Sequence, residues 1–357
     1  MKKSLCEISN PKQWKTISTD MLTETGYPVY GANGIIGYYS TYNHDCETLL
    51  ITCRGATCGS LNICQPFSYV NGNAMALDSL SADIDIRYLY YYLLNRGLND
   101  VITGSAQPQI VRQSLEKVIV EYPELNIQKS IVETLDKISK IISLRKQQLS
   151  KLDELVKSRF IELFGSGNYP VCRLGDVCSK ITDGTHKTPN YLDAGVTFIS
   201  AKNIVNGELD FSDVKYISDQ EYAEIQKRCQ TDVGDILLSK SGSLGAPVIV
   251  KTTERIGLFE SLAVIKYDRN KLLPEFLCEQ LKSDKIQRQF KVGTKGVAIK
   301  HLHLGVIAET DIVVPPIEDQ NAFAAFVEQI DKSKLEIQKS LEKLETLKKA
   351  LMQKYFG

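Results

Sequence analysis

Hydrophobic positions recur at heptad spacing in two long stretches of the chain, and neither stretch contains Gly or Pro. This spacing is typical of a coiled coil, in which one apolar stripe faces a partner helix. We expect a first helix from about residue 128 to 163, on the order of 50 Å long, and a second near the C-terminus. The stripe positions are Ile138, Ile142, Leu149, Leu152 and Val156 in the first helix and Ile330, Ile337, Leu341, Leu344 and Leu351 in the second.

Cations interrupt both stripes. Arg145 and Arg159 fall on the first stripe, and Lys334 and Lys348 fall on the second. They should weaken an apolar seam, because a buried charge without a partner is costly. We favour an intramolecular antiparallel pair, since two equivalent stripes can cover each other. The alternative is that each helix packs on its own domain.

The two helical stretches are copies of one another. Residues 123–165 align without a gap onto 315–357, at a constant offset of 192. Both copies begin with a Pro-x4-Gln pattern, at Pro123 and Gln128 and again at Pro315 and Gln320, and both end in Phe-Gly. A long internal repeat of this kind predicts one structural plan used twice.

The regions before each helix resemble each other more weakly. Short apolar runs at 48–52, 235–239 and 247–250 predict strands, and the spacing at 85–98 and 274–290 predicts helices. The predicted fold is therefore α+β: two mixed α/β domains, separated by two long antiparallel coiled-coil helices and related by a pseudo-two-fold internal repeat. The expected boundaries are a first domain at 1–122, a central helix at 123–165, a second domain at 166–314 and a C-terminal helix at 315–357.

Glycine pairs follow a predicted strand in each half, at Gly55 and Gly59 and at Gly242 and Gly245. Glycine permits positive φ and lets a ligand approach the backbone closely. An ordinary tight turn is the alternative interpretation.

Charge narrows the possible partners. Lys+Arg and Asp+Glu both number 43, so the net charge is zero. This excludes nucleic-acid binding through bulk positive charge and requires any basic surface to be local. No apolar run approaches the length of a membrane span, and the first residues have no signal-peptide core. We expect a soluble, cytoplasmic protein that does not associate with a membrane.

Residues for catalysis or metal binding are sparse. There is no GxxxxGK[ST] loop, no GxGxxG after a strand and no [DN]PP[YF] motif. The Asp213-Val-Lys215 triplet matches a nuclease pattern weakly, and His301 and His303 have no third ligand nearby. The nine cysteines form no CxxC pair, so reduced thiols are expected and not zinc. We predict that the chain is not an enzyme and holds no metal.

Polar residues in the predicted loops suit DNA recognition better. Asn and Gln pair with adenine edges, and Lys and Arg with guanine edges or phosphates. Taken singly, each is more often part of a solvated loop. The candidate DNA contacts are Asn33, Arg54, Thr57 and Gln109 in the first half and Thr185, His186, Lys187, Lys202, Asn203, Lys240 and Lys295 in the second.

Several motifs resemble a known family. They are Asp-Gly-Thr-His-x-Thr-Pro at 183–189, Phe-Ile-Ser-Ala-Lys-Asn-Ile at 198–204, the Gly-Asp-Ile-Leu-Leu-Ser-Lys-Ser-Gly run at 234–242 and the two Pro-x4-Gln joints. With the repeat, they resemble the specificity (S) subunit of type I restriction-modification systems, in which two target recognition domains alternate with two helical regions. The first half has the family's common opening at 27–37 but lacks the Asp-Gly-Thr-His loop, so its DNA target should differ.

The resemblance implies a non-catalytic subunit that recognises a bipartite, asymmetric double-stranded DNA target. It implies two methyltransferase (M) subunits as direct partners and motor-nuclease (R) subunits held through them. S-adenosylmethionine, ATP and Mg would belong to those partners, with no cofactor in this chain. A stand-alone DNA-cleaving enzyme and a coiled-coil adaptor unrelated to DNA remain the alternatives.

Overall fold

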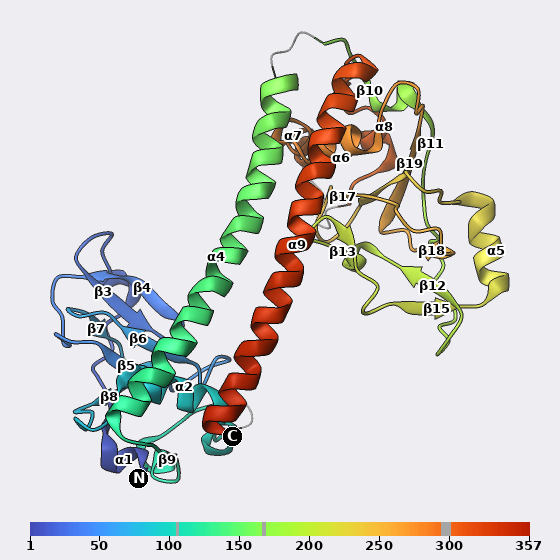
Figure 1. Cartoon of the computed structure of the whole chain (residues 1–357). Coiled ribbons are helices and arrows are strands. Elements are labelled where there is room, and N and C mark those ends of the chain that lie inside the picture. Colours follow the sequence, from blue (N-terminus) through green and yellow to red (C-terminus); the bar gives the residue numbers. More distant parts are fainter. Residues whose placement is uncertain (105–106, 166–168, 294–300) are drawn as a thin grey trace. The chain divides into compact units, whose positions relative to one another are not determined.

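A computed structural model describes residues 1–104, 107–165, 169–293 and 301–357 (Figure 1). The chain divides into two compact units. Unit 1 comprises Met1–Lys146 and Gln338–Gly357, and unit 2 comprises Gln147–Ile337. Two 40-residue helices, α4 (Leu125–Phe164) and α9 (Ile317–Phe356), run through both units. About half of each helix belongs to unit 1 and the other half to unit 2.

The body of unit 1 contains a four-stranded antiparallel sheet in the order β2-β8-β5-β6, a three-stranded sheet in the order β4-β3-β7 and a β1–β9 pair. Its strands are β1 (Lys2–Ser4), β2 (Asn10–Gln13), β3 (Tyr27–Gly31), β4 (Gly34–Tyr39), β5 (Thr48–Thr52), β6 (Leu61–Cys64), β7 (Tyr69–Val70), β8 (Ala74–Asp78) and β9 (Ile119–Glu121). Its helices are α1 (Leu5–Ile8), η1 (Thr19–Met21), α2 (Ile86–Arg96), η2 (Asn99–Val101) and α3 (Arg112–Leu115).

The body of unit 2 repeats this arrangement, with sheets in the orders β11-β19-β16-β17 and β15-β12-β18, a β10–β20 pair and an additional β13–β14 hairpin. Its strands are β10 (Val171–Arg173), β11 (Cys178–Asp183), β12 (Val196–Ile199), β13 (Ile204–Val205), β14 (Glu208–Leu209), β15 (Lys215–Ile217), β16 (Ile236–Ser239), β17 (Pro247–Ile249), β18 (Ile256–Leu258), β19 (Leu262–Tyr267) and β20 (Asp311–Val313). Its helices are η3 (Leu174–Val177), η4 (Ala201–Asn203), α5 (Asp219–Arg228), α6 (Pro274–Lys282), α7 (Asp284–Gly293) and α8 (Leu304–Ala308).

The matching sheet orders confirm the internal repeat. One expectation needs correction, because the helix expected at 274–290 is two helices, α6 and α7. The break falls at Ser283, whose φ of −62° and ψ of 147° are extended backbone angles. No helix in the described parts of the chain is both long and apolar enough to cross a membrane.

One of the two inner strands of each four-stranded sheet, β5 in unit 1 and β16 in unit 2, is buried on both faces. In β5, Leu49 and Ile51 belong to the core cluster beneath α2, whereas Leu50 belongs to a separate cluster with Val70 of the three-stranded sheet. Side chains alternate between the two faces of a strand, so a continuous apolar run must separate two cores. The corresponding strand β16 divides its side chains between two clusters in the same way.

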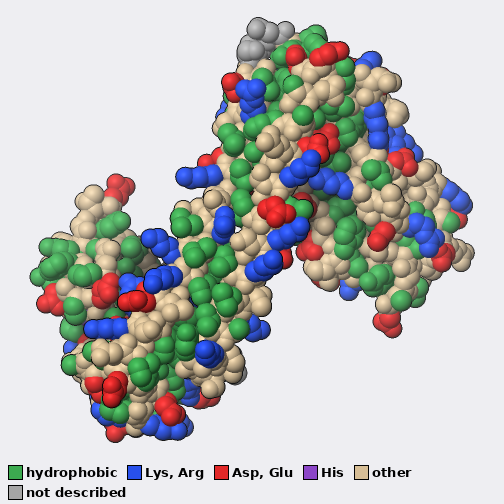
Figure 2. All heavy atoms as spheres, viewed as in Figure 1, with side chains coloured by type: hydrophobic (Ala, Val, Ile, Leu, Met, Phe, Trp, Pro, Cys, Tyr) green, Lys and Arg blue, Asp and Glu red, His purple; other side chains and the backbone are tan. Residues whose placement is uncertain are grey.

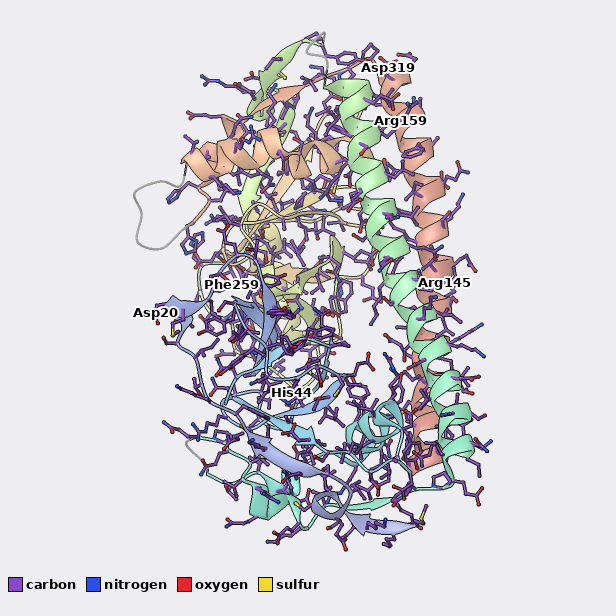
Figure 3. All side chains as sticks on the ribbon, turned by 90° about the vertical axis from the view of Figure 1, so that its left-hand side faces the viewer. Asp20, His44, Arg145, Arg159, Phe259 and Asp319 are labelled. Carbon is purple, nitrogen blue, oxygen red and sulfur yellow. The ribbon has the colours of Figure 1, made fainter. Side chains whose placement is uncertain are left out.

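The long helices pair antiparallel, and this is visible inside each unit. In unit 1, Lys146 of α4 lies 2.9 Å from Glu345 of α9. In unit 2, Phe160 of α4 packs edge-on against Phe323 of α9, with ring centroids 5.6 Å apart. Figure 3 shows Arg159 of α4 and Asp319 of α9 near the same end of the two helices.

The predicted stripe faces inward at all ten positions. Ile138, Val156, Ile330 and Leu341 are buried, and the other six are half-buried. One interrupting cation is also paired across the seam, because Lys334 of α9 lies 2.5 Å from Asp153 of α4. The antiparallel coiled coil is therefore confirmed, and one of its four interrupting cations forms an ion pair with the other helix.

A buried glutamine fixes the start of each long helix. Gln128 of α4 accepts a hydrogen bond from the Asp85 N–H and donates to the carbonyls of Asp83 and Pro123, at 2.9 Å each. Both Gln128 and its repeat counterpart, Gln320 of α9, are fully buried. In unit 2 the counterpart makes the same three bonds one repeat later, to the Leu273 N–H at 2.9 Å, the Lys271 carbonyl at 2.8 Å and the Pro315 carbonyl at 2.9 Å. The Pro-x4-Gln joint thus ties helix to body in both units.

Candidate nucleic-acid interface

Three loops of unit 1 meet at one end of its sheets. The loop after β5 is bridged to the segment before α3, because Arg54 and Gln109 form an isolated antiparallel β-bridge. The same loop is joined to the β3–β4 turn, since the Thr52 hydroxyl donates to the Ala32 carbonyl. The fold therefore brings Asn33, next to Ala32, into the neighbourhood of Arg54 and Gln109.

The side chains in this three-loop surface of unit 1 are available to a ligand. Asn33, Arg54 and Gln109 are exposed, and Thr57 is half-buried. Arg54 forms no ion pair with any of the described residues. An exposed guanidinium can serve as a two-pronged donor to a guanine edge or to a phosphate.

The glycines that follow β5 and β16 have the conformation that the sequence suggests. Gly55 and Gly59 have φ of 90°, and Gly242 and Gly245 have φ of 71° and 78°. A Cβ added to Gly55 or Gly242 would meet no atom within 4 Å, so neither glycine is required for packing. Both backbones turn at an open surface, in equivalent loops of the two units.

An exposed aromatic cluster lies at the end of the β3–β4 hairpin opposite its turn, and the sequence did not single it out. Tyr42 makes edge-on contacts with Tyr27 and Phe67, at centroid distances of 4.9 and 5.2 Å. These rings are 37–50% exposed, and Figure 2 shows hydrophobic side chains gathered on this part of unit 1. Aromatic rings can stack on bases or sugars, but this cluster is separated from Asn33 by the length of the hairpin.

In unit 2 the Asp-Gly-Thr-His loop starts from a buried acid. Asp183, at the end of β11, is 2% exposed. It accepts hydrogen bonds from Lys240 and Arg228, and the His186 ring lies 3.2 Å away. Burial acts to raise the pKa of Asp183, but the hydrogen bond and charge of Lys240, aided by Arg228 and His186, outweigh burial and lower it. The carboxylate therefore stays ionised and holds the loop.

The second residue of the motif must be glycine for steric reasons. A Cβ on Gly184 would lie 2.1 Å from the Leu258 carbonyl oxygen of β18, far inside van der Waals contact. The next residue, Thr185, uses this close approach, because its N–H donates to the same carbonyl at 2.9 Å. The motif thus holds the loop in direct contact with β18.

The outer part of the loop is displayed to solvent. The His186 Nδ1 atom lies 2.6 Å from the Glu260 carboxylate, so the ring is held between Glu260 and Asp183. Lys187 is exposed and forms no ion pair with any described residue, whereas Thr185 is half-buried. The loop offers a fixed imidazole and an unneutralised cation to a ligand.

Two candidate contacts of unit 2 are structural instead. Lys240 is 8% exposed and paired with Asp183, and its carbonyl accepts from the Leu302 N–H. Asn203 is 3% exposed and uses its amide on the Asp210 and Asp213 carbonyls and on the Ser200 N–H. Both side chains are committed inside the domain, so we no longer expect them to contact DNA.

The remaining candidates of unit 2 differ in availability. Lys202 is exposed but lies 2.8 Å from the Asp213 carboxylate. Asp213 is also the acidic residue of the nuclease-like triplet at 213–215. Lys295 lies outside the described residues. Lys202 occupies the turn after β12, as Asn33 occupies the turn after β3, so the two units present different side chains from equivalent positions.

Arg228 and Glu260 are site residues that sequence analysis missed. Arg228 ends α5, and Glu260 follows β18. Both reach the Asp-Gly-Thr-His loop only through the tertiary fold, and nothing in their local sequence marks them. In the parts of the chain that the structure describes, no group of His, Cys, Asp and Glu side chains is arranged to hold a metal ion.

The fold and these loops define a class of protein, in which two structurally repeated units carry different sets of polar loops at equivalent positions. Comparison with known proteins identifies the family. The chain belongs to the type I restriction modification DNA specificity domain family, whose model matches residues 2–154 and again 167–349. It is thus a DNA specificity subunit of the type I restriction-modification kind, a recognition subunit and not a catalytic one.

Individual relatives agree with this assignment. A type I restriction enzyme specificity subunit of Haemophilus influenzae is 22% identical, covering 92% of this chain and 87% of its own. The S subunit of M. genitalium has a similar fold, with a TM-score of 0.63 at 16% identity, covering 100% of this chain and 96% of that one. A chain from a structural study of complex assembly and conformational transition in a type I R-M system gives a TM-score of 0.57 at 14% identity, covering 100% and 97%.

Proposed function

We propose that the two units recognise the two halves of a split, asymmetric DNA target. The observation that carries this proposal is the placement of divergent loops on equivalent positions of one repeated frame. Asn33 and Arg54 stand where unit 2 has Lys202 and Ser241, and only unit 2 has the loop displaying His186. Two different surfaces are expected to select different half-sites, so we expect an asymmetric target.

The helix pair would set the gap between the half-sites. Each long helix contains 40 residues, so at 1.5 Å per residue the pair is about 60 Å long. Two sites on the same face of B-DNA are separated by whole helical turns, each of 10–10.5 bp or about 34–36 Å. Lengthening both helices by matched whole turns is then expected to change the unrecognised spacer and to leave both half-sequences intact.

We further propose that two methyltransferase subunits bind the paired helices and that motor-nuclease subunits join through them. Leu155 of α4 and Leu347 of α9 support this stoichiometry, because they are equivalent in the repeat and are 46% and 47% exposed. Isolated exposed leucines are ordinary, but a pair that recurs at one offset on two helices offers equivalent contacts to two equivalent partners.

The chemistry would belong to those partners. The methyltransferase subunits would bind S-adenosylmethionine and extrude the target base, because a base inside the stack cannot be reached. ATP and Mg would serve the motor-nuclease subunits. A complex that acts on cellular DNA would place this chain in the cytoplasm.

The test is a binding titration with labelled duplexes that carry the target or a scrambled sequence. The chain has zero net charge, so alone it should bind weakly, since non-specific affinity rests on phosphate neutralisation. Addition of the methyltransferase subunit should give a two-to-one complex with tight, target-specific binding. Tight specific binding by the chain alone would contradict the proposed division of labour.

Matched variants separate recognition from general attraction. Arg54→Ala should weaken binding by about 1–3 kcal/mol and relax one position if Arg54 contacts a base, whereas a phosphate contact weakens all sequences alike and lowers the salt dependence. Lys117→Ala removes a similar exposed charge from the same unit and is the control. Lys187→Ala, with Lys271→Ala as its control, asks the same question of unit 2.

A further inference from the structure

A pocket of about 330 Å³ opens in unit 2, at the end of α4 and away from the loops discussed above. Its walls come from α4, the α6–α7 segment and the edge formed by β10 and β20. The inner wall is apolar and buried, and includes Phe160, Phe164, Ile286 and Ile312. Ile161, which is 64% exposed, lies at the mouth.

The repeat shows what unit 1 places at the equivalent position. The helix-joint glutamines bond to the N–H groups of Asp85 and Leu273, which are the N-caps of α2 and α6. Seven residues beyond each N-cap lie Tyr92 in unit 1 and Gln280 in unit 2. The two helices are therefore in register, and the pocket lies beside the residue that replaces the tyrosine.

Tyr92 completes an aromatic cluster in unit 1. Its ring packs edge-on against Phe356, at a centroid distance of 6.0 Å, and its hydroxyl donates to the Ile119 carbonyl at 3.1 Å. Phe356 corresponds to Phe164 in the repeat, and Phe164 lines the pocket of unit 2. In unit 2 the Tyr169 ring contacts this phenylalanine at a centroid distance of 5.8 Å, but no phenol occupies the position of Tyr92.

We propose that this pocket binds a phenol-type aromatic group, as found in a free small phenol or on a tyrosine side chain. The ring would pack on Phe164 and Ile286, in the manner of Tyr92 on Phe356. The space is sufficient, because an apolar cavity of about 150 Å³ already holds benzene. The pocket volume of about 330 Å³ also falls at the lower end of the usual range for ligand sites.

A buried polar atom of the pocket-lining residue Gln280 favours a ring that carries a donor. Gln280 is 3% exposed, and its Nε2 group donates to the Val313 carbonyl at 3.1 Å. Its Oε1 atom accepts no hydrogen bond from any described residue. Buried polar groups normally have partners. A small rotation of the amide would let Oε1 accept from a phenolic hydroxyl in the pocket.

The experiment uses the full chain with its isoleucine methyl groups labelled for NMR. Ile161, Ile286 and Ile312 line the pocket and report occupancy locally. Titration with p-cresol should shift these three signals. Toluene, which has the same ring and no donor, should bind about three- to tenfold more weakly, as expected for one hydrogen bond. N-acetyl-tyrosinamide tests whether a tyrosine with its backbone can enter.

Variants at Gln280 decide the outcome. Gln280→Tyr copies unit 1 and should abolish the shifts, whereas Gln280→Met keeps the space and should bind p-cresol and toluene equally. Binding of both p-cresol and N-acetyl-tyrosinamide supports a tyrosine side chain as occupant, and binding of p-cresol alone supports a free phenol. Absence of p-cresol binding, or equal binding to folded Gln280→Tyr protein, would overturn the proposal.

Discussion

Replacing Asp183 by Asn should strongly destabilise unit 2. The carboxylate is 2% exposed, and it accepts from Lys240, itself only 8% exposed. Asn keeps the size and an acceptor oxygen but removes the charge, which leaves the Lys240 ammonium buried without compensation. Breaking a buried pair from one side costs about 3–5 kcal/mol. A second substitution, Lys240→Met, should restore most of this free energy because it removes the unmatched charge.

Unit 1 supports this reasoning. The strand registers place Gln13 and Cys53 at the positions of Asp183 and Lys240. There the Gln13 amide donates to the Cys53 sulfur at 2.8 Å. A neutral pair at the same place in the same frame indicates that the ion pair is not required by the fold itself. Only the loss of one partner is expected to be costly.

Urea unfolding measures the effect. With a dependence of about 2 kcal/mol per M, a loss of 3–5 kcal/mol lowers the midpoint by about 1.5–2.5 M. Circular dichroism follows the whole chain, while the fluorescence of Trp14, the chain's one tryptophan, follows unit 1. Asp219→Asn is the matched control, because it breaks an exposed pair with Arg255, and it should cost no more than about 1 kcal/mol.

Acid titration tests the same pair independently. The pKa of Asp183 is lower in the folded chain than its ordinary value of 3.8, so its contribution to stability is complete above pH 3.8. That contribution is lost as the pH falls below 3.8, through the lowered folded pKa. Asp183→Asn should therefore be less sensitive to acid in this range. A midpoint unchanged by Asp183→Asn, or a double variant as unstable as the single one, would refute the reasoning.

Three further predictions concern the helix joints, the Asp-Gly-Thr-His loop and the helix seam. Gln320→Ala and Gln128→Ala should each destabilise their own unit by about 2–4 kcal/mol, because each leaves buried backbone groups unpaired. If one substitution lowered the hydrogen-exchange protection of both units equally, the two joints would not be independent. Gly184→Ala should lower affinity for one half-site only, since its Cβ would lie 2.1 Å from the Leu258 oxygen; a crystal structure with an unmoved loop would contradict this. Val156→Asp should cost several kcal/mol by burying a charge at the seam, whereas exposed Leu155→Asp should change the melting temperature little.

Much of the fold is predictable from the sequence because its signals are local and periodic. The heptad stripe predicts ten inward positions, and all ten are buried or half-buried. The gapless offset of 192 predicts equivalent joints, and Gln128 and Gln320 make the same three bonds. A strand with no charged position, such as β5, also indicates burial on both faces from its residue pattern alone.

The site is less predictable because it depends on contacts between distant segments. Lys240 and Asn203 look like loop cations and amides, yet tertiary partners bury both of them. Arg228 and Glu260 reach His186 from 42 and 74 positions away in the chain, and no local pattern marks either residue. Burial and pairing decide whether a polar loop residue is structural or available, and the sequence does not contain that information locally.

Methylation mapping tests the central claim most directly. A host that lacks other methyltransferases would carry the complete system, and its methylome would be sequenced with the wild-type chain and with loop variants. The account predicts a two-part asymmetric target with a fixed gap, in which changes at Asn33, Arg54 and Gln109 alter one half and changes at His186 and Lys187 alter the other. A continuous or palindromic target, or variants of one unit that alter both halves, would contradict it.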